Sequence, residues 1–158
     1  MKHCLNIRMI MLTFMLLVGA LPAAAVQRPF ALNGNGLADF ISDGAGHVIG
    51  ANVTSSGTAT HLGLWTSVGT LYLAPDPNNS TQLLAAGTGT ITAADGDKIE
   101  FVLENSVLDV TTSISRGIFR FVGGTGRFAA ATGTTDFVVV QNLVTGAFQL
   151  TAVGNIDF

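Results

Sequence analysis

The chain has 158 residues and a formal net charge of −3, with seven Lys and Arg residues against ten Asp and Glu. This mildly acidic balance argues against a nucleic-acid-binding protein, because phosphate binding needs clustered Lys and Arg. A single cysteine, Cys4, excludes a disulfide framework within the chain.

Residues 1–25 have the pattern of a cleavable signal peptide. Lys2 and Arg8 give a positively charged start, and residues 9–21 form an almost unbroken apolar run. The three alanines at 23–25 then match the small residues that signal peptidase requires. The apolar run is shorter than the roughly 20 residues of a transmembrane helix. We therefore expect cleavage before Val26 and a secreted or periplasmic product without a membrane span.

Residues 26–158 are expected to form one domain. Cleavage removes two basic residues and Cys4, so five basic residues remain beside all ten acidic ones and the net charge becomes −5. This length is ample for one hydrophobic core and too short for two typical domains. An exported domain without disulfides must be held together by that core.

Short runs of β-forming residues alternate with turn residues along the whole of this segment, which is typical of a sandwich or barrel. Eight strands are expected, over residues 30–41, 47–54, 60–73, 82–93, 97–105, 114–123, 130–141 and 146–157. The turns between them include Ser55-Ser56-Gly57 and Asp95-Gly96, of which the second is a strong hairpin signal.

The last strand has the clearest period of two. Apolar or small residues from Phe148 to Phe158 occupy alternate positions, and polar residues occupy most of the others. Short connections favour an up-and-down antiparallel order, and closure removes the unpaired edges that invite aggregation. The predicted fold is therefore an all-β, eight-stranded, antiparallel closed barrel, with a sandwich as the alternative.

Four charged residues predict how two of these strands pair. Antiparallel pairing of residues 98–104 with 116–122, with partner numbers that sum to 220, places Glu100 opposite Arg120 and Glu104 opposite Arg116. The aromatic residues then lie on the other face, which we expect to point into the core. If the charged face points inward instead, these four residues are candidates for a buried active site in the cavity.

The stretch Phe121-Val122-Gly123-Gly124-Thr125-Gly126-Arg127-Phe128-Ala129-Ala130-Ala131-Thr132-Gly133 resembles a segment of the allene oxide cyclase and dirigent proteins. Together with segments near residues 60–63 and 87–97, the resemblance covers roughly residues 60–135. It implies a calycin-like, eight-stranded barrel with a central cavity. It assigns no catalytic residue, because the residues that describe activity in those families lie outside this motif.

The same stretch has a physical interpretation of its own. Gly123, Gly124 and Gly126 permit backbone angles that other residues avoid, so a strand can end, turn tightly and restart. Phe128 can then plug one end of the barrel. We interpret these four residues as a structural turn.

Catalytic and metal-binding signatures are missing from the sequence pattern. The glycine run lacks the Lys and helix of a phosphate-binding loop, and no Gly-x-Ser-x-Gly elbow is present. His47 and His61 are too few for a zinc site. The acids between Asp95 and Glu104 do not have the spacing of a calcium-binding loop and are expected at a solvated hairpin end. The sequence thus predicts no metal and no cofactor.

Two functions remain open from the sequence. The first is a non-catalytic exported barrel that binds a small apolar ligand or serves as a structural or interaction protein. The alternative is an allene oxide cyclase-like cyclase or isomerase that acts by holding a substrate in a productive shape. A cavity of several hundred Å³ with a few convergent polar groups favours ligand binding or cyclase chemistry, whereas a filled interior favours a structural role.

Overall fold

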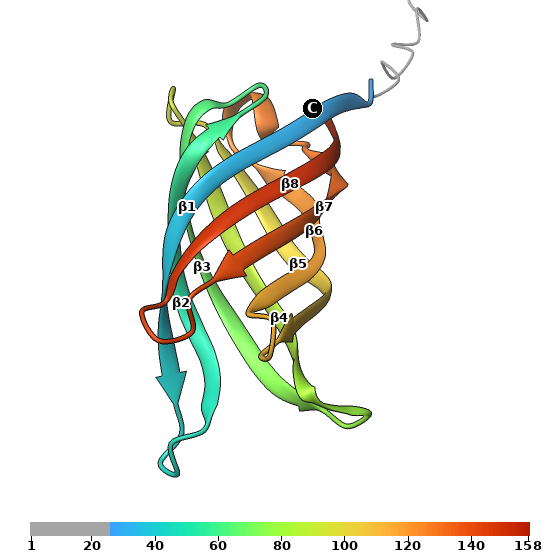
Figure 1. Cartoon of the computed structure of the whole chain (residues 1–158). Coiled ribbons are helices and arrows are strands. Elements are labelled where there is room, and N and C mark those ends of the chain that lie inside the picture. Colours follow the sequence, from blue (N-terminus) through green and yellow to red (C-terminus); the bar gives the residue numbers. More distant parts are fainter. Residues whose placement is uncertain (1–25) are drawn as a thin grey trace, which may run out of the picture.

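The computed structural model describes residues 26–158, so the predicted signal peptide lies outside the described residues. This part of the chain forms one antiparallel barrel in which each strand pairs with the next and β8 pairs with β1. The strands are β1 (Arg28–Ser42), β2 (Val48–Ala59), β3 (Gly63–Asp76), β4 (Asn79–Ala93), β5 (Lys98–Asp109), β6 (Ile114–Gly124), β7 (Thr132–Gln141) and β8 (Ala147–Asp157). The predicted fold class is confirmed (Figure 1).

The two ends of the barrel differ. The chain enters β1 and leaves β8 at one end, which also carries the β2–β3, β4–β5 and β6–β7 connections. At the other end the β1–β2 and β3–β4 hairpins extend beyond the remaining strands (Figure 1). We call the first the closed end and the second the mouth.

The closed end holds the most completely buried large side chains of the core. Phe30, Phe121, Phe128, Ile99 and Ile156 are at most 2% exposed and belong to one hydrophobic cluster. Phe30 and Phe121 meet edge to face, with ring centroids 5.3 Å apart. The C-terminal strand runs from the mouth to this end, and its alternation is borne out along its length, with Phe148, Leu150, Ala152 and Ile156 all buried. Burial of these side chains removes a large apolar area from water and stabilises the barrel.

The predicted turn at Ser55-Ser56-Gly57 is wrong, because β2 continues through it to Ala59. Ser55 points inward and is 9% exposed, and its hydroxyl bonds to that of Ser67 on β3. Gly57 lies so close to β1 that a Cβ would collide with the carbonyl oxygen of Asn33. The small residues that resemble a turn therefore permit close packing of three strands.

Strands β5 and β6 are antiparallel neighbours, as predicted, but the individual pairs differ. Partner numbers sum to 222 in the centre, where Phe101 faces Phe121 and Val102 faces Arg120. Irregularities between Glu100 and Phe101 and between Glu104 and Val107 shift the register toward both ends. The two-residue slip in the centre keeps the side chains there on their expected faces, so Phe101, Phe119 and Phe121 are buried inside the barrel.

The glycine-rich stretch plugs the closed end. After β6 it forms a single 3-10 turn, Gly126–Phe128, and Phe128 is fully buried. Gly123 and Gly126 have φ values of 125° and 55°, in the region that favours glycine. The guanidinium of Arg127 forms a salt bridge with Asp95, with Nη1 and Oδ2 2.9 Å apart, and donates a hydrogen bond to the carbonyl oxygen of His61. These contacts attach the turn to the β4–β5 and β2–β3 connections.

Candidate functional site

The interior contains a cavity of about 100 Å³ on the mouth side of the core. Its walls include Phe40, Leu73, Leu108 and Gln141, which lie close to the mouth ends of their strands. The cavity is smaller than the roughly 300–1,000 Å³ of common ligand pockets. It is about two-thirds of the size of an engineered 150 Å³ cavity that takes up benzene. The interior is therefore not filled, but its cavity is smaller than the several hundred Å³ expected of a typical ligand or cyclase pocket.

Aromatic and aliphatic side chains form most of the cavity wall. Phe101 and Phe119 meet edge to face at 4.8 Å, and Phe119 stacks on Phe137 at 4.4 Å. Glycines on neighbouring strands leave space for the rings, since a Cβ on Gly89 would collide with the ring of Phe101. This alternation of rings and glycines sets the shape of the cavity.

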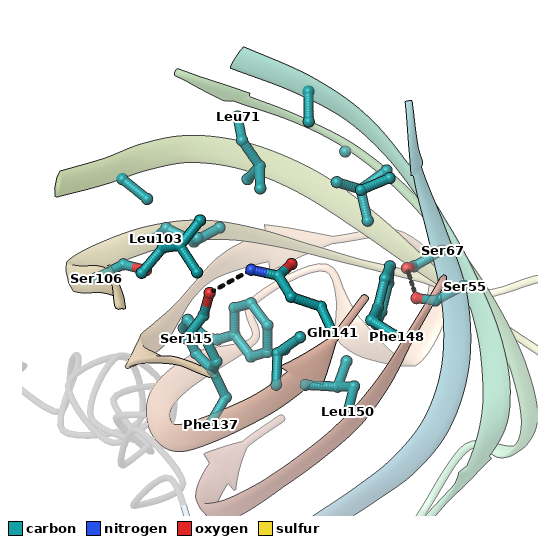
Figure 2. A pocket seen from close by; sticks show the side chains of 18 of the residues that line it. Ser55, Ser67, Leu71, Leu103, Ser106, Ser115, Phe137, Gln141, Phe148 and Leu150 are labelled. Carbon is teal, nitrogen blue, oxygen red and sulfur yellow. Dashed lines mark hydrogen bonds between the residues drawn. The ribbon is translucent and has the colours of Figure 1, made fainter. Parts of the chain in front are cut away.

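Two pairs of polar side chains interrupt the apolar wall (Figure 2). The hydroxyls of Ser55 and Ser67 lie 2.7 Å apart on one side. On the other side, Nε2 of Gln141 donates to Oγ of Ser115 over 3.3 Å. Ser106, on the wall beside Leu103, is only 4% exposed. These uncharged groups can orient a ligand by hydrogen bonding.

The four charged residues considered as cavity candidates face outward. Glu100, Arg116 and Arg120 are exposed and Glu104 is half-buried, and none of them lines the cavity. Glu104 accepts a 2.5 Å bond from Nε of Arg120, which lies diagonally across from it rather than opposite. An exposed pair of this kind contributes about 0.2–1 kcal/mol. The inward orientation that would have made them an active site is not the one observed.

Asp43 and Asp109 organise two of the turns at the mouth. Backbone hydrogen bonding from His47, followed by its ring, lowers the pKa of Asp43. The hydroxyl of Thr111 is the main cause that lowers the pKa of Asp109. Because both pKa values are lowered, the contacts of the ionised carboxylates stabilise the turns fully at pH values above 3.8, the ordinary pKa of Asp. This stabilisation is lost as the pH falls through the lower pKa of the folded state.

The remaining candidates do not converge on a site. His61 lies in the β2–β3 connection at the closed end, where its Nε2 is 3.1 Å from the carbonyl oxygen of Pro29. His47 lies in the β1–β2 connection at the mouth. Among residues 26–158, no three His, Cys, Asp or Glu side chains gather in a way that could hold a metal ion. No helix in that same range is long and apolar enough to cross a membrane.

No model of a known protein family matches this chain, and no curated protein matches it. The candidate site is therefore defined by its own geometry. Sequence reasoning missed its polar members, including Ser55, which it placed in a turn. The alternation Ala51, Val53, Ser55, Gly57, Ala59 on one face was the available signal.

Proposed function

We propose that this protein is an exported, non-catalytic β-barrel that binds a small, largely apolar ligand through its mouth. The observation that carries the proposal is the asymmetry of the interior. One end is sealed by Phe128, which is fully buried, and the other contains a cavity of about 100 Å³. No titratable side chain lines that cavity among the described residues.

The size of the cavity limits what is held inside. About 100 Å³ accommodates a short chain or a small ring, and any larger ligand extends into the mouth between the two long hairpins. Burial of an apolar group there contributes about 25 cal/mol per Å² removed from water. The protein would thus bind one end of an apolar molecule and leave the other end accessible.

Binding of benzene tests the proposal, with a variant that blocks the cavity. Ala85 is half-buried and lines the cavity, so Ala85→Phe places a ring in it. We expect benzene-saturated buffer to raise the melting temperature of the wild type, because a ligand that binds only the folded state stabilises it. Ala85→Phe should show no such rise.

Ala86→Phe is the matched control. Ala86 is the next residue on β4 and is exposed on the outer face, so its ring should leave benzene binding unchanged. A wild type whose melting temperature does not respond to benzene would contradict ligand binding by this cavity.

Export is part of the proposal and rests on residues 1–25. The intact mass of the protein recovered from the periplasm or medium should correspond to a chain that begins at Val26, within two residues. A mass that includes Lys2 and Cys4 would rule out cleavage at this position. The relation to allene oxide cyclase and dirigent proteins stays a prediction, as does cyclase or isomerase chemistry, which no contact in the cavity favours.

A further inference from the structure

The Ser55–Ser67 pair has unused hydrogen-bonding capacity. Two hydroxyls carry two O–H donors and four lone pairs, and one bond between them uses one of each. Neither hydroxyl makes another hydrogen bond to the described residues. Ser55 is 9% exposed and both residues line the cavity. One O–H donor of the pair is therefore free to bind a group inside the cavity.

The surroundings of this pair are apolar. A Cβ on Gly36 would collide with Cζ of Phe148 and would lie 2.7 Å from Cβ of Ser55, so the end of the phenyl ring lies beside the serine. Figure 2 shows Phe148 next to the two serines on that wall. A ligand that reaches the hydroxyls must therefore place its apolar part against a ring.

The strand register shows how far this pair lies from the Gln141–Ser115 pair. Paired residues form a row from Gln141, the last residue of β7, through Phe148 and Gly36 to Ser55 and Ser67. Three strand spacings separate Gln141 from Ser55, or about 14 Å along the wall. The serine pair is thus a second polar site in the cavity wall, separate from the Gln141–Ser115 pair at the mouth.

The charge of the ligand follows from the cavity wall. Burial of an ionised group without a partner is costly, and the described lining has no cation or anion to compensate a ligand charge. We propose, as an extension that rests on the proposed function, that the ligand is a neutral molecule with a hydroxyl or carbonyl oxygen that accepts a hydrogen bond from the Ser55–Ser67 pair. Its apolar part lies against Phe148 and the neighbouring rings.

The test uses 1-hexanol and hexanoate as probes, with protein recovered after export of the full chain. Binding is followed at pH 7 by chemical-shift changes of the Leu and Val methyl groups. We expect hexanoate, which is ionised at this pH, to bind at least about tenfold more weakly than 1-hexanol. The double variant Ser55→Ala/Ser67→Ala should bind 1-hexanol about two- to tenfold more weakly, since one hydrogen bond is lost, and should keep its affinity for benzene.

The matched control is Ser56→Ala/Thr66→Ala. These residues are opposite each other on the same two strands, one position from the serine pair, and both are exposed. The control should bind 1-hexanol like the wild type.

The other possible binding results would contradict the role of the serine pair, the charge of the ligand or the proposed function. Equal binding of 1-hexanol by the wild type and the serine variant, or an equal loss of benzene and 1-hexanol binding, would show that the pair does not recognise an oxygen. Hexanoate binding as tight as that of 1-hexanol would overturn the neutral charge of the ligand. Failure of the wild type to bind 1-hexanol while it still binds benzene would overturn this inference alone, whereas failure of both probes would overturn the proposed function itself.

Discussion

Phe128→Ala should lower the free energy of unfolding by about 3–5 kcal/mol, as expected when a fully buried phenyl ring is removed from a core. Phe128 has no exposed surface, and its ring centroid lies 4.7 Å from that of Phe158. The guanidinium of Arg127 lies over the same ring at 4.7 Å. Loss of the ring leaves a cavity where the β6–β7 connection closes the barrel. Urea denaturation, fitted to two states, measures the change.

Val144→Ala is the control for this measurement. Val144 is 93% exposed in the β7–β8 connection at the mouth, so its truncation should change stability by less than about 0.5 kcal/mol. If Phe128→Ala were equally mild, Phe128 would not be the plug of the closed end.

Gly124→Val should destabilise the barrel by about 1–3 kcal/mol, the usual cost of forcing extra atoms into a packed site. A Cβ at this position would collide with the carbonyl oxygen of Lys98 and lie 3.1 Å from Cα of Ile99. That carbonyl accepts a 2.9 Å bond from the backbone N–H of Thr125. The larger side chain must therefore push the end of β6 away from β5. Thermal unfolding followed by circular dichroism measures the loss.

The reason for this effect differs between the glycines of the turn. Gly123 and Gly126 have positive φ, whereas Gly124 is required by close approach of another strand. Gly44→Val is the matched control, because nothing lies within 4 Å of a Cβ at Gly44. Equal stabilities of the two valine variants would contradict the close contact at Gly124.

The barrel could be predicted because its strands carry their own periodicity. The alternation from Phe148 to Ile156 identifies a strand with one buried face, and it pairs with β1 to close the sheet. Small-residue strands are less clear in sequence, and the end of β2 was mistaken for a turn. Gly57 and Ser55 are there because neighbouring strands approach closely, which depends on the three-dimensional packing.

The β5–β6 register was predicted only to within two or three residues for a related reason. Asn105 has a φ of 48° and lies between Glu104 and Val107, where the pairing shifts. A bulge of this kind adds residues to one strand without a change in the hydrophobic pattern on either side. The pattern therefore fixed which faces are inside and left the exact partners open.

The cavity itself could not be predicted from the sequence. Its wall combines residues from all eight strands, and its polar pairs join residues 12 and 26 positions apart. Which inward residues enclose space, and which fill it, depends on the tilt and closure of the sheet. Gly36 makes room for the ring of Phe148, and Gly89 makes room for the ring of Phe101. These contacts join different strands, so they are recognised only once the pairing of the strands is known.

Native mass spectrometry of the exported protein from its own host tests ligand binding most directly. We expect a population heavier than the bare chain by the mass of one neutral, largely apolar molecule. Ala85→Phe should lack this population, and Ala86→Phe should keep it. The bare mass in all three proteins, or the same added mass in Ala85→Phe as in the wild type, would contradict a ligand held in the barrel cavity.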